Sequence, residues 1–249
     1  MIIAEVGQNW GGDLRLAGTL IKEAVANGAD MVKFQLYDTD KVYKGKPCYH
    51  TYAKMAELTQ VQWEYLVSIA ANENIPIFAS VFDADKVQWC EDVDVPMYKI
   101  ASRMRDKDLI HAVRATGKPV IVSRDPNRID SSLQGIIDTF PRLSLLYCVS
   151  SYPALPSQVD FPDFGAGFWH GGVAFYSGFS DHTLGIEMSL CALARGAMII
   201  EKHFTLDKYA LGFDNLWSMT SDELAKLVKY QSNLKIVYGD SRDWITNNR

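Results

Sequence analysis

The sequence predicts a single (β/α)8 TIM barrel of the α/β class over residues 1–249. Short apolar runs rich in β-branched residues alternate with helix-length amphipathic stretches along the whole chain. Strict alternation indicates a parallel sheet, and eight strand-helix units that close on themselves form a barrel of this length. The competing fold, an open doubly wound sheet, usually begins with a GxGxxG turn, and the stretch Gly7-Gln8-Asn9-Trp10-Gly11-Gly12 lacks that spacing.

Eight runs are the predicted strands, in chain order. They are Ile2–Val6, Met31–Gln35, Ile77–Ser80, Met97–Ile100, Val120–Ser123, Ser144–Val149, Val173–Ser177 and Met198–His203. Two long irregular stretches, Leu36–Thr59 and Ser151–Gly172, follow the second and sixth strands. We expect both to lie over the carboxyl ends of the strands, where barrels carry loops that cover the active site.

The composition narrows the classes of protein. The net charge of −5 argues against nucleic-acid and anionic-membrane partners, which require a positive surface. No apolar run approaches the roughly 20 residues of a membrane span, and Glu5 and Gly7 interrupt any secretory signal. Cys90, Cys148 and Cys191 lie in apolar or amphipathic runs, which predicts buried free thiols. We therefore expect a soluble protein in the reducing cytoplasm.

Polar residues stand at the predicted carboxyl ends of nearly all strands, where a barrel places its active site. They are Glu5, Lys33, Gln35, Ser80, Lys99, Ser102, Ser123, Ser150, Ser180, Asp181, His182, Glu201, Lys202 and His203. A single serine among them fits a solvated loop equally well. The whole set in register fits a site better.

His182 and His203 end the predicted seventh and eighth strands, which are neighbours in a barrel. Two imidazoles at that spacing suit Mn²⁺, Fe²⁺ or Zn²⁺, with positions open for water or substrate, and Asp181 or a nearby carboxylate could orient one ring. The alternative is two unrelated histidines, one capping a helix and one packed on the barrel rim.

Lys33 and Lys99 each interrupt an otherwise apolar strand. A lysine is seldom buried without a partner, and two cations among strand-end hydroxyls suit a phosphate or carboxylate. A lysine of lowered pKa that forms a Schiff base also fits. The second lysine and the two histidines favour anion binding.

Six motifs resemble the N-acetylneuraminate (sialic acid) synthase family. They are Ile3-Ala4-Glu5-Val6-Gly7-Gln8-Asn9, Val32-Lys33-Phe34-Gln35, Pro96-Met97-Tyr98-Lys99-Ile100-Ala101-Ser102, Tyr147-Cys148-Val149-Ser150-Ser151-Tyr152-Pro153, Ser180-Asp181-His182-Thr183-Leu184-Gly185 and Ile200-Glu201-Lys202-His203-Phe204-Thr205. The resemblance implies a TIM-barrel enzyme that condenses phosphoenolpyruvate with an open-chain aldose, typically N-acetylmannosamine. The products would be a 2-keto-3-deoxy sugar acid of the nonulosonic type and phosphate.

The resemblance also implies roles for individual residues. A divalent ion, Mn²⁺ or Mg²⁺, would be held by His182 and His203, and Glu5 could order the attacking water or a metal-bound one. The residues that would hold phosphoenolpyruvate are Lys33, Ser80, Lys99, Ser102, Ser150 and Ser180. The sugar would meet Gln35, Tyr152 and Asp214, and the catalytic set would be Glu5, Gln35, His182 and His203.

The sequence departs from the family pattern on the acceptor side. Met104 replaces an acid that contacts the sugar, Trp10 replaces a histidine, and Ser123-Arg124-Asp125-Pro126 replaces Ser-Thr-Gly-Met. Trp10 and the arginines Arg103, Arg105 and Arg124 would make the mouth bulkier and more cationic. The C-terminal antifreeze-like domain of most members has no counterpart in these 249 residues, so a second copy or a partner chain is a candidate to cover the mouth.

These departures leave alternatives open. Drift in a paralogue of relaxed specificity and a new acceptor with a negative group both account for the arginines. A paralogue that only binds phosphoenolpyruvate or sugar, and a lysine-dependent aldolase that needs neither metal nor phosphoenolpyruvate, are the competing functions.

Overall fold

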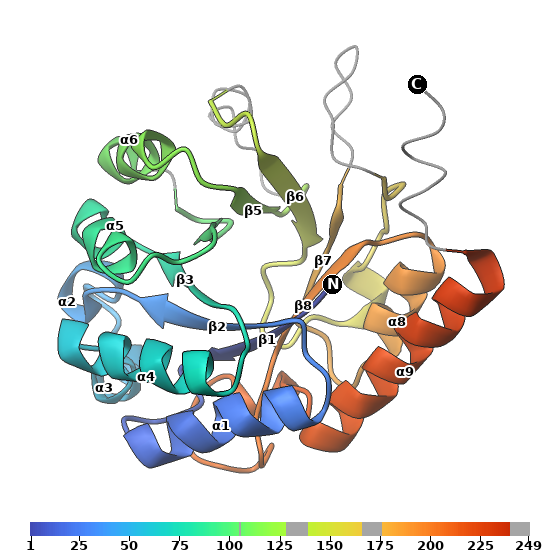
Figure 1. The fold of residues 1–249 in the computed structure, drawn as a ribbon, viewed down its shortest axis with the longest axis horizontal. Coiled ribbons are helices and arrows are strands. Elements are labelled where there is room, and N and C mark those ends of the chain that lie inside the picture. Colours follow the sequence, from blue (N-terminus) through green and yellow to red (C-terminus); the bar gives the residue numbers. More distant parts are fainter. Residues whose placement is uncertain (105, 128–138, 166–175, 240–249) are drawn as a thin grey trace.

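The computed structural model describes residues 1–104, 106–127, 139–165 and 176–239. Its eight parallel strands close into one barrel in chain order, which confirms the predicted fold class (Figure 1). The strands are β1 (Ile2–Gly7), β2 (Met31–Leu36), β3 (Ile77–Val81), β4 (Tyr98–Ile100), β5 (Val120–Arg124), β6 (Leu143–Cys148), β7 (Gly178–Asp181) and β8 (Ile199–His203).

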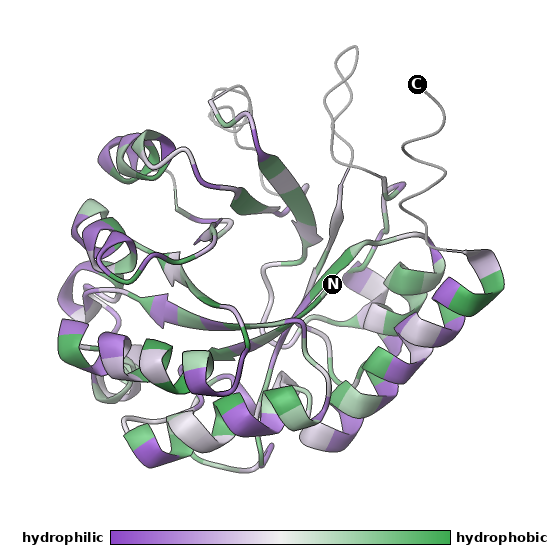
Figure 2. Cartoon of the chain, in the orientation of Figure 1, coloured by the Kyte–Doolittle hydropathy of each residue, from purple (hydrophilic) through white to green (hydrophobic). Residues whose placement is uncertain are grey.

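Helices surround the strands (Figure 1). They are α1 (Leu14–Ala26), α2 (Thr39–Val42), α3 (Pro47–Met55), α4 (Gln60–Asn72), α5 (Ala84–Glu91), α6 (Lys107–Ala115), α8 (Glu187–Ala194) and α9 (Ser221–Tyr238), with short 3-10 turns at Pro156–Gln158 and Asn215–Trp217. Helix α1 shows why these segments are helical. Asp13 caps it by accepting hydrogen bonds from the amides of Arg15 and Leu16, and its buried face carries Leu20 and Ile21. Several surrounding helices likewise carry hydrophilic and hydrophobic residues in alternating bands (Figure 2).

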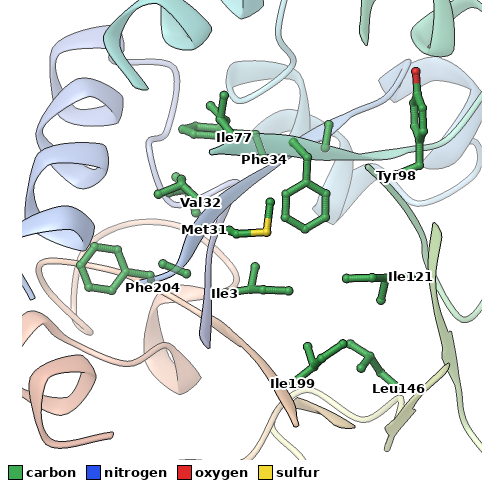
Figure 3. Close-up of a cluster of buried hydrophobic side chains, with 14 of the residues drawn as sticks. Ile3, Met31, Val32, Phe34, Ile77, Tyr98, Ile121, Leu146, Ile199 and Phe204 are labelled. Atoms are coloured by element: carbon green, nitrogen blue, oxygen red, sulfur yellow. The ribbon is translucent and has the colours of Figure 1, made fainter. Parts of the chain in front are cut away.

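The barrel interior is apolar toward the amino ends of the strands and polar toward the carboxyl ends. Ile3, Ile121 and Ile199 lie around one apolar space in Figure 3, and all three are buried. Side chains alternate along a strand, so the residue two positions after Ile3 also points inward. That residue is Glu5, which pairs in register with Lys33 on β2 and with His203 on β8.

The predicted seventh strand is wrong. The strand β7 is Gly178–Asp181, whereas the prediction placed it at Val173–Ser177, of which residues 173–175 lie outside the described residues. The strand carries a single large apolar side chain, Phe179, and so lacks an apolar run. Gly178 is required, because a Cβ there would lie 1.9 Å from the carbonyl oxygen of Ile199 on the neighbouring strand.

Three smaller expectations change. The stretch Leu36–Thr59 contains the helices α2 and α3 and is therefore only partly irregular. Cys90 and Cys148 are buried, but Cys191 is exposed because it lies on the outer face of α8. Trp10 is almost completely buried in the hydrophobic core and so does not narrow the mouth. Within the described residues, no helix combines the length and apolar character needed to cross a bilayer.

Candidate active site

A cavity opens at the carboxyl ends of the strands. Its lining residues are Glu5, Lys33, Gln35, Ser80, Phe82, Lys99, Ala101, Ser102, Ser123, Cys148, Tyr152, Ser180, His182, Glu201 and His203. Ten of the twelve residues that the sequence assigned to a site are in this set. The other two lie beside it: Ser150 Oγ is 3.1 Å from Ser102 Oγ, and Asp214 Oδ2 is 3.6 Å from His203 Nδ1.

Four buried charges alternate across the floor of the cavity. We call Glu5, Lys33, Lys99 and Glu201 the four-charge network. Lys33 Nζ lies 2.9 Å from Glu5 Oε2 and 3.4 Å from Glu201 Oε2, and Lys99 Nζ lies 2.6 Å from Glu201 Oε1. Two carboxylates and two ammonium groups neutralise one another. This pairing explains how two lysines can occupy the interior of a barrel.

The pairing also sets the ionisation of these groups. Burial alone would raise the pKa of Glu201, but Lys33 and Lys99 outweigh it and hold the pKa well below its usual range. Burial raises the pKa of Glu5 despite the opposing charge of Lys33. Burial lowers the pKa of Lys99, with Glu201 opposing the shift, whereas the two carboxylates outweigh burial at Lys33 and raise its pKa. Glu5 is thus the carboxylate of the network that most readily takes up a proton.

Hydroxyl and amide groups complete the floor. Lys33 Nζ donates to Ser80 Oγ at 2.7 Å, and Ser180 Oγ donates to Glu201 Oε1 at 2.8 Å. Gln35 Nε2 donates to Glu5 Oε1 at 2.9 Å, so this amide fixes one oxygen of the carboxylate. The floor therefore offers ammonium and hydroxyl donors within one small space, which suits an oxyanion.

His182 and His203 lie beside the network with ring centroids 6.1 Å apart. His182 Nδ1 is 2.9 Å from the carbonyl oxygen of Val149, which assigns the proton to Nδ1 and leaves the lone pair on Nε2. Burial lowers the pKa of His182 to about 4 and the pKa of His203 well below its usual range. Both imidazoles are therefore neutral near pH 7, as metal ligands must be.

Gly7 makes room for one of these rings. Its backbone φ is +55°, and a Cβ at this position would lie 3.1 Å from both Cε1 and Nδ1 of His203 and 3.3 Å from Gln35 Nε2. A larger residue would be strained and would push against both side chains. The glycine of the first strand is thus part of the construction of the site.

The two histidines meet the chemical requirements of a divalent-metal site. His203 Nδ1 is buried without a hydrogen-bond partner among the described residues, and the ring of His182 has a free nitrogen. Within the same residues, no cluster of three or more histidine, cysteine or carboxylate side chains forms a closed metal cage. An ion held here would keep positions for water and substrate, as catalytic sites do.

A family comparison identifies the chain. The model described as the NeuB family matches residues 20–243. The chain belongs to the NeuB family.

Relatives named as sugar-acid synthases support the assignment. The N,N'-diacetyllegionaminic acid synthase of Campylobacter jejuni is 31% identical over 96% of this chain and 78% of its own length. The N-acetylneuraminate-9-phosphate synthase of Homo sapiens is 30% identical over 92% of this chain and 68% of its own length. A crystal structure of N-acetylneuraminic acid synthetase from Leptospira borgpetersenii, in complex with citrate, superposes with a TM-score of 0.83 at 33% identity, covering 96% of this chain and 85% of that one.

The rim of this NeuB-family site is more open than its floor. We use rim for Tyr152, Arg103 and Asp214. The Tyr152 ring packs on His182 at 4.4 Å between centroids and is 44% exposed, and Arg103 is exposed. Burial and the charge of Glu5 raise the pKa of Asp214 to about 7, with Arg103 opposing the shift. Met104, which stands where the family has an acid, packs against the hydrophobic core and is absent from the cavity lining. Arg105 lies outside the described residues.

One residue has a role that the sequence did not predict, and one predicted role is wrong. Glu201 was recognised as a strand-end polar residue without a role, yet it joins both lysines of the floor. Its place in the Glu-Lys-His motif was the available signal. The expectation that Asp181 orients a histidine ring is wrong, because the Val149 carbonyl fills that role and Asp181 points to the outer side of the strand.

Proposed function

We propose that this NeuB-family chain condenses phosphoenolpyruvate with an open-chain aldose to give a 2-keto-3-deoxy sugar acid and phosphate. The observation that carries the proposal is the four-charge network lying beside two neutral imidazoles in one cavity. The relatives named as legionaminic and neuraminic acid synthases support it.

The reaction balances with water as the third reactant. C3 of phosphoenolpyruvate forms a bond to the aldehyde carbon of the aldose, and the aldehyde oxygen takes up a proton. Water adds at C2, and one of its protons is removed. The C2–O bond to phosphate then breaks while the new C2 hydroxyl gives up its proton to the departing phosphate, which releases inorganic phosphate and leaves the 2-keto group.

The floor residues supply binding and proton transfer. Lys33 and Lys99, with the hydroxyls of Ser80, Ser102, Ser150 and Ser180, would bind the phosphate and carboxylate of phosphoenolpyruvate. Glu5 would accept the proton of the attacking water, a role that suits a carboxylate of raised pKa held in place by Gln35. Gln35, Tyr152 and Asp214 would contact the sugar.

His182 and His203 would hold the divalent ion, Mn²⁺ or Mg²⁺, which supplies Lewis acidity toward the aldehyde oxygen when bound. Electrostatics supports a cation here. The four-charge network is already neutral and both imidazoles are uncharged, so an anion with a carboxylate and a phosphate would add uncompensated negative charge. A divalent ion at the histidines offsets it.

The acceptor would carry a negative group of its own. Arg103 is exposed at the rim, and burial raises the pKa values of Tyr43 and Asp214 while the charge of Arg103 opposes each shift. The positive charge of the guanidinium therefore reaches the ionisable groups on the sugar side of the cavity. An acidic aldose would pair with it.

The test is an assay of phosphate release with Mn²⁺, phosphoenolpyruvate and a panel of neutral and acidic aldoses. We expect aldose-dependent release that a chelator abolishes. Tight phosphoenolpyruvate binding without turnover on any aldose would instead indicate a binding module. Borohydride trapping of a substrate on Lys99, whose pKa burial lowers, would indicate a lysine-dependent aldolase.

A further inference from the structure

A second buried ion pair lies behind the histidines, on the outer side of the same two strands. Asp181 on β7 and Lys202 on β8 are register partners, and each precedes one of the two histidines. Lys202 Nζ lies 3.1 Å from Asp181 Oδ2, and both side chains are 0% exposed. Neither residue lines the cavity, so the pair does not contact a ligand bound there.

Both members of this pair also hold the residue after His182. Asp181 Oδ1 accepts hydrogen bonds from the amide of Thr183 at 2.8 Å and from its hydroxyl at 2.7 Å. Lys202 Nζ donates to the Thr183 carbonyl oxygen at 2.8 Å, and Ser189 Oγ on α8 donates to Asp181 Oδ2 at 2.6 Å. The chain on both sides of His182 is therefore tied to β8 and to α8.

The backbone of His182 is fixed from the opposite side as well. The Ala154 amide donates to the His182 carbonyl oxygen at 2.9 Å, and the ring is held by Val149. Thr183 and Asp181, which flank His182, are thus bonded to Lys202, which precedes His203. Fold stability alone does not require charges here, since apolar residues of similar volume often replace buried ion pairs without loss.

We propose that Asp181 and Lys202 are positioning residues that set the separation of His182 and His203 and so the affinity for a divalent ion. This inference rests on the metal site of the proposed function. The pair acts as a cross-strand brace: the Asp181–Lys202 contact fixes the two strand ends laterally, and the bonds to Thr183 fix the turn that carries His182.

The experiment measures Mn²⁺ affinity by electron paramagnetic resonance and the Tm of each purified full-length variant. Asp181→Asn and Lys202→Met should weaken Mn²⁺ binding by roughly 10- to 100-fold, the range seen when residues that orient metal ligands are changed. The double variant Asp181→Asn/Lys202→Met keeps an amide oxygen that can accept from Thr183 and leaves no unpaired buried charge, so it should regain part of the Tm that the single variants lose, while Mn²⁺ binding stays weak.

Two further variants separate positioning from stability. Leu227→Ala changes a fully buried residue on α9, and it should lower the Tm and leave Mn²⁺ affinity unchanged. Ser189→Ala keeps the ion pair and should weaken Mn²⁺ binding only about threefold, because it removes a single hydrogen bond. It also tests the brace if the charge variants do not fold.

Failure of the brace and failure of the metal site give different results. A double variant that binds Mn²⁺ like the wild-type protein would show that the pair serves stability alone and would overturn the inference. Should the charge variants not fold, wild-type Mn²⁺ binding by Ser189→Ala would show that the bonds which hold Asp181 do not set the position of His182, and would overturn it as well. His182→Ala is the reference for the site itself. If it loses Mn²⁺ binding while the brace variants keep it, only the brace is wrong. If it keeps Mn²⁺ binding, the metal site of the proposed function fails, and the brace fails with it.

Discussion

The floor and the rim of the barrel mouth differ in how their polar groups are held. On the floor, Lys33, Lys99 and Glu201 are each at most 5% exposed and bonded to groups on other strands. At the rim, Tyr152 is 44% exposed and Arg103 projects from the loop after β4. Rigid floor groups can hold a substrate in one geometry, which suits the substrate that is common to the reactions of the family. Exposed rim groups can change between members, which suits selection of the acceptor.

The largest expected effect comes from breaking the floor. Lys99→Met should lower kcat/KM by about 10³-fold and abolish phosphoenolpyruvate binding, because it removes a donor to the anion and leaves Lys33 as the one cation of the network beside Glu201. Steady-state kinetics and calorimetry measure both quantities. Lys118→Met is the matched control: Lys118 is also partly buried between two acids, Glu91 and Asp94, but precedes β5 at the opposite end of the barrel, so activity should persist.

A change at Glu5 separates proton transfer from binding on the same floor. Glu5→Gln keeps the shape of the side chain but cannot accept a proton, so kcat should fall by roughly 10²-fold. The affinity for phosphoenolpyruvate should not fall, because the variant removes a negative charge beside Lys33. Equal losses of kcat and of phosphoenolpyruvate affinity would contradict the assignment of Glu5 as the base.

The buried imidazole of His182 predicts a dependence of stability on pH. Its pKa is about 4 in the folded state and 6.5 in the unfolded state, so the unfolded state binds more protons between these values and stability falls as pH falls. In metal-free protein, the unfolding free energy of the wild type relative to that of His182→Gln should therefore fall by about 3 kcal/mol between pH 7 and pH 4.

Chemical denaturation at several pH values measures that difference. The matched control is His111→Gln, because His111 is exposed on α6 and its replacement should give no such trend. A difference for His182→Gln that is constant with pH would show that the imidazole is not held neutral by burial.

The smallest effect is expected at the rim. Arg103→Ala should raise the KM for an acidic aldose about tenfold, the loss of one exposed charge contact, and leave the KM for phosphoenolpyruvate unchanged. Arg114→Ala, an exposed arginine on α6, is the control. Equal changes in the two KM values would show that floor and rim are not independent.

The alternation of the sequence was sufficient to predict the barrel and most strands, because an apolar run in a parallel sheet is visible without tertiary information. It failed at β7. Gly178 is needed there for close packing against β8 and Ser180 lines the cavity, so this strand has no apolar run. The positions of Lys33 and His203 at strand ends were sufficient to predict that both line one cavity. They could not show that Glu201 neutralises both lysines, since that depends on the register of β8 across the closed barrel.

The affinity for phosphoenolpyruvate with and without Mn²⁺, measured by titration calorimetry in the absence of any aldose, tests the central claim most directly. The neutral four-charge network predicts that Mn²⁺ tightens binding at least about tenfold, and linkage requires phosphoenolpyruvate to tighten Mn²⁺ binding by the same factor. The Arg103→Ala variant should show the same coupling. Equal affinities with and without Mn²⁺, or no binding in either case, would contradict a floor built for an anion and a divalent ion together.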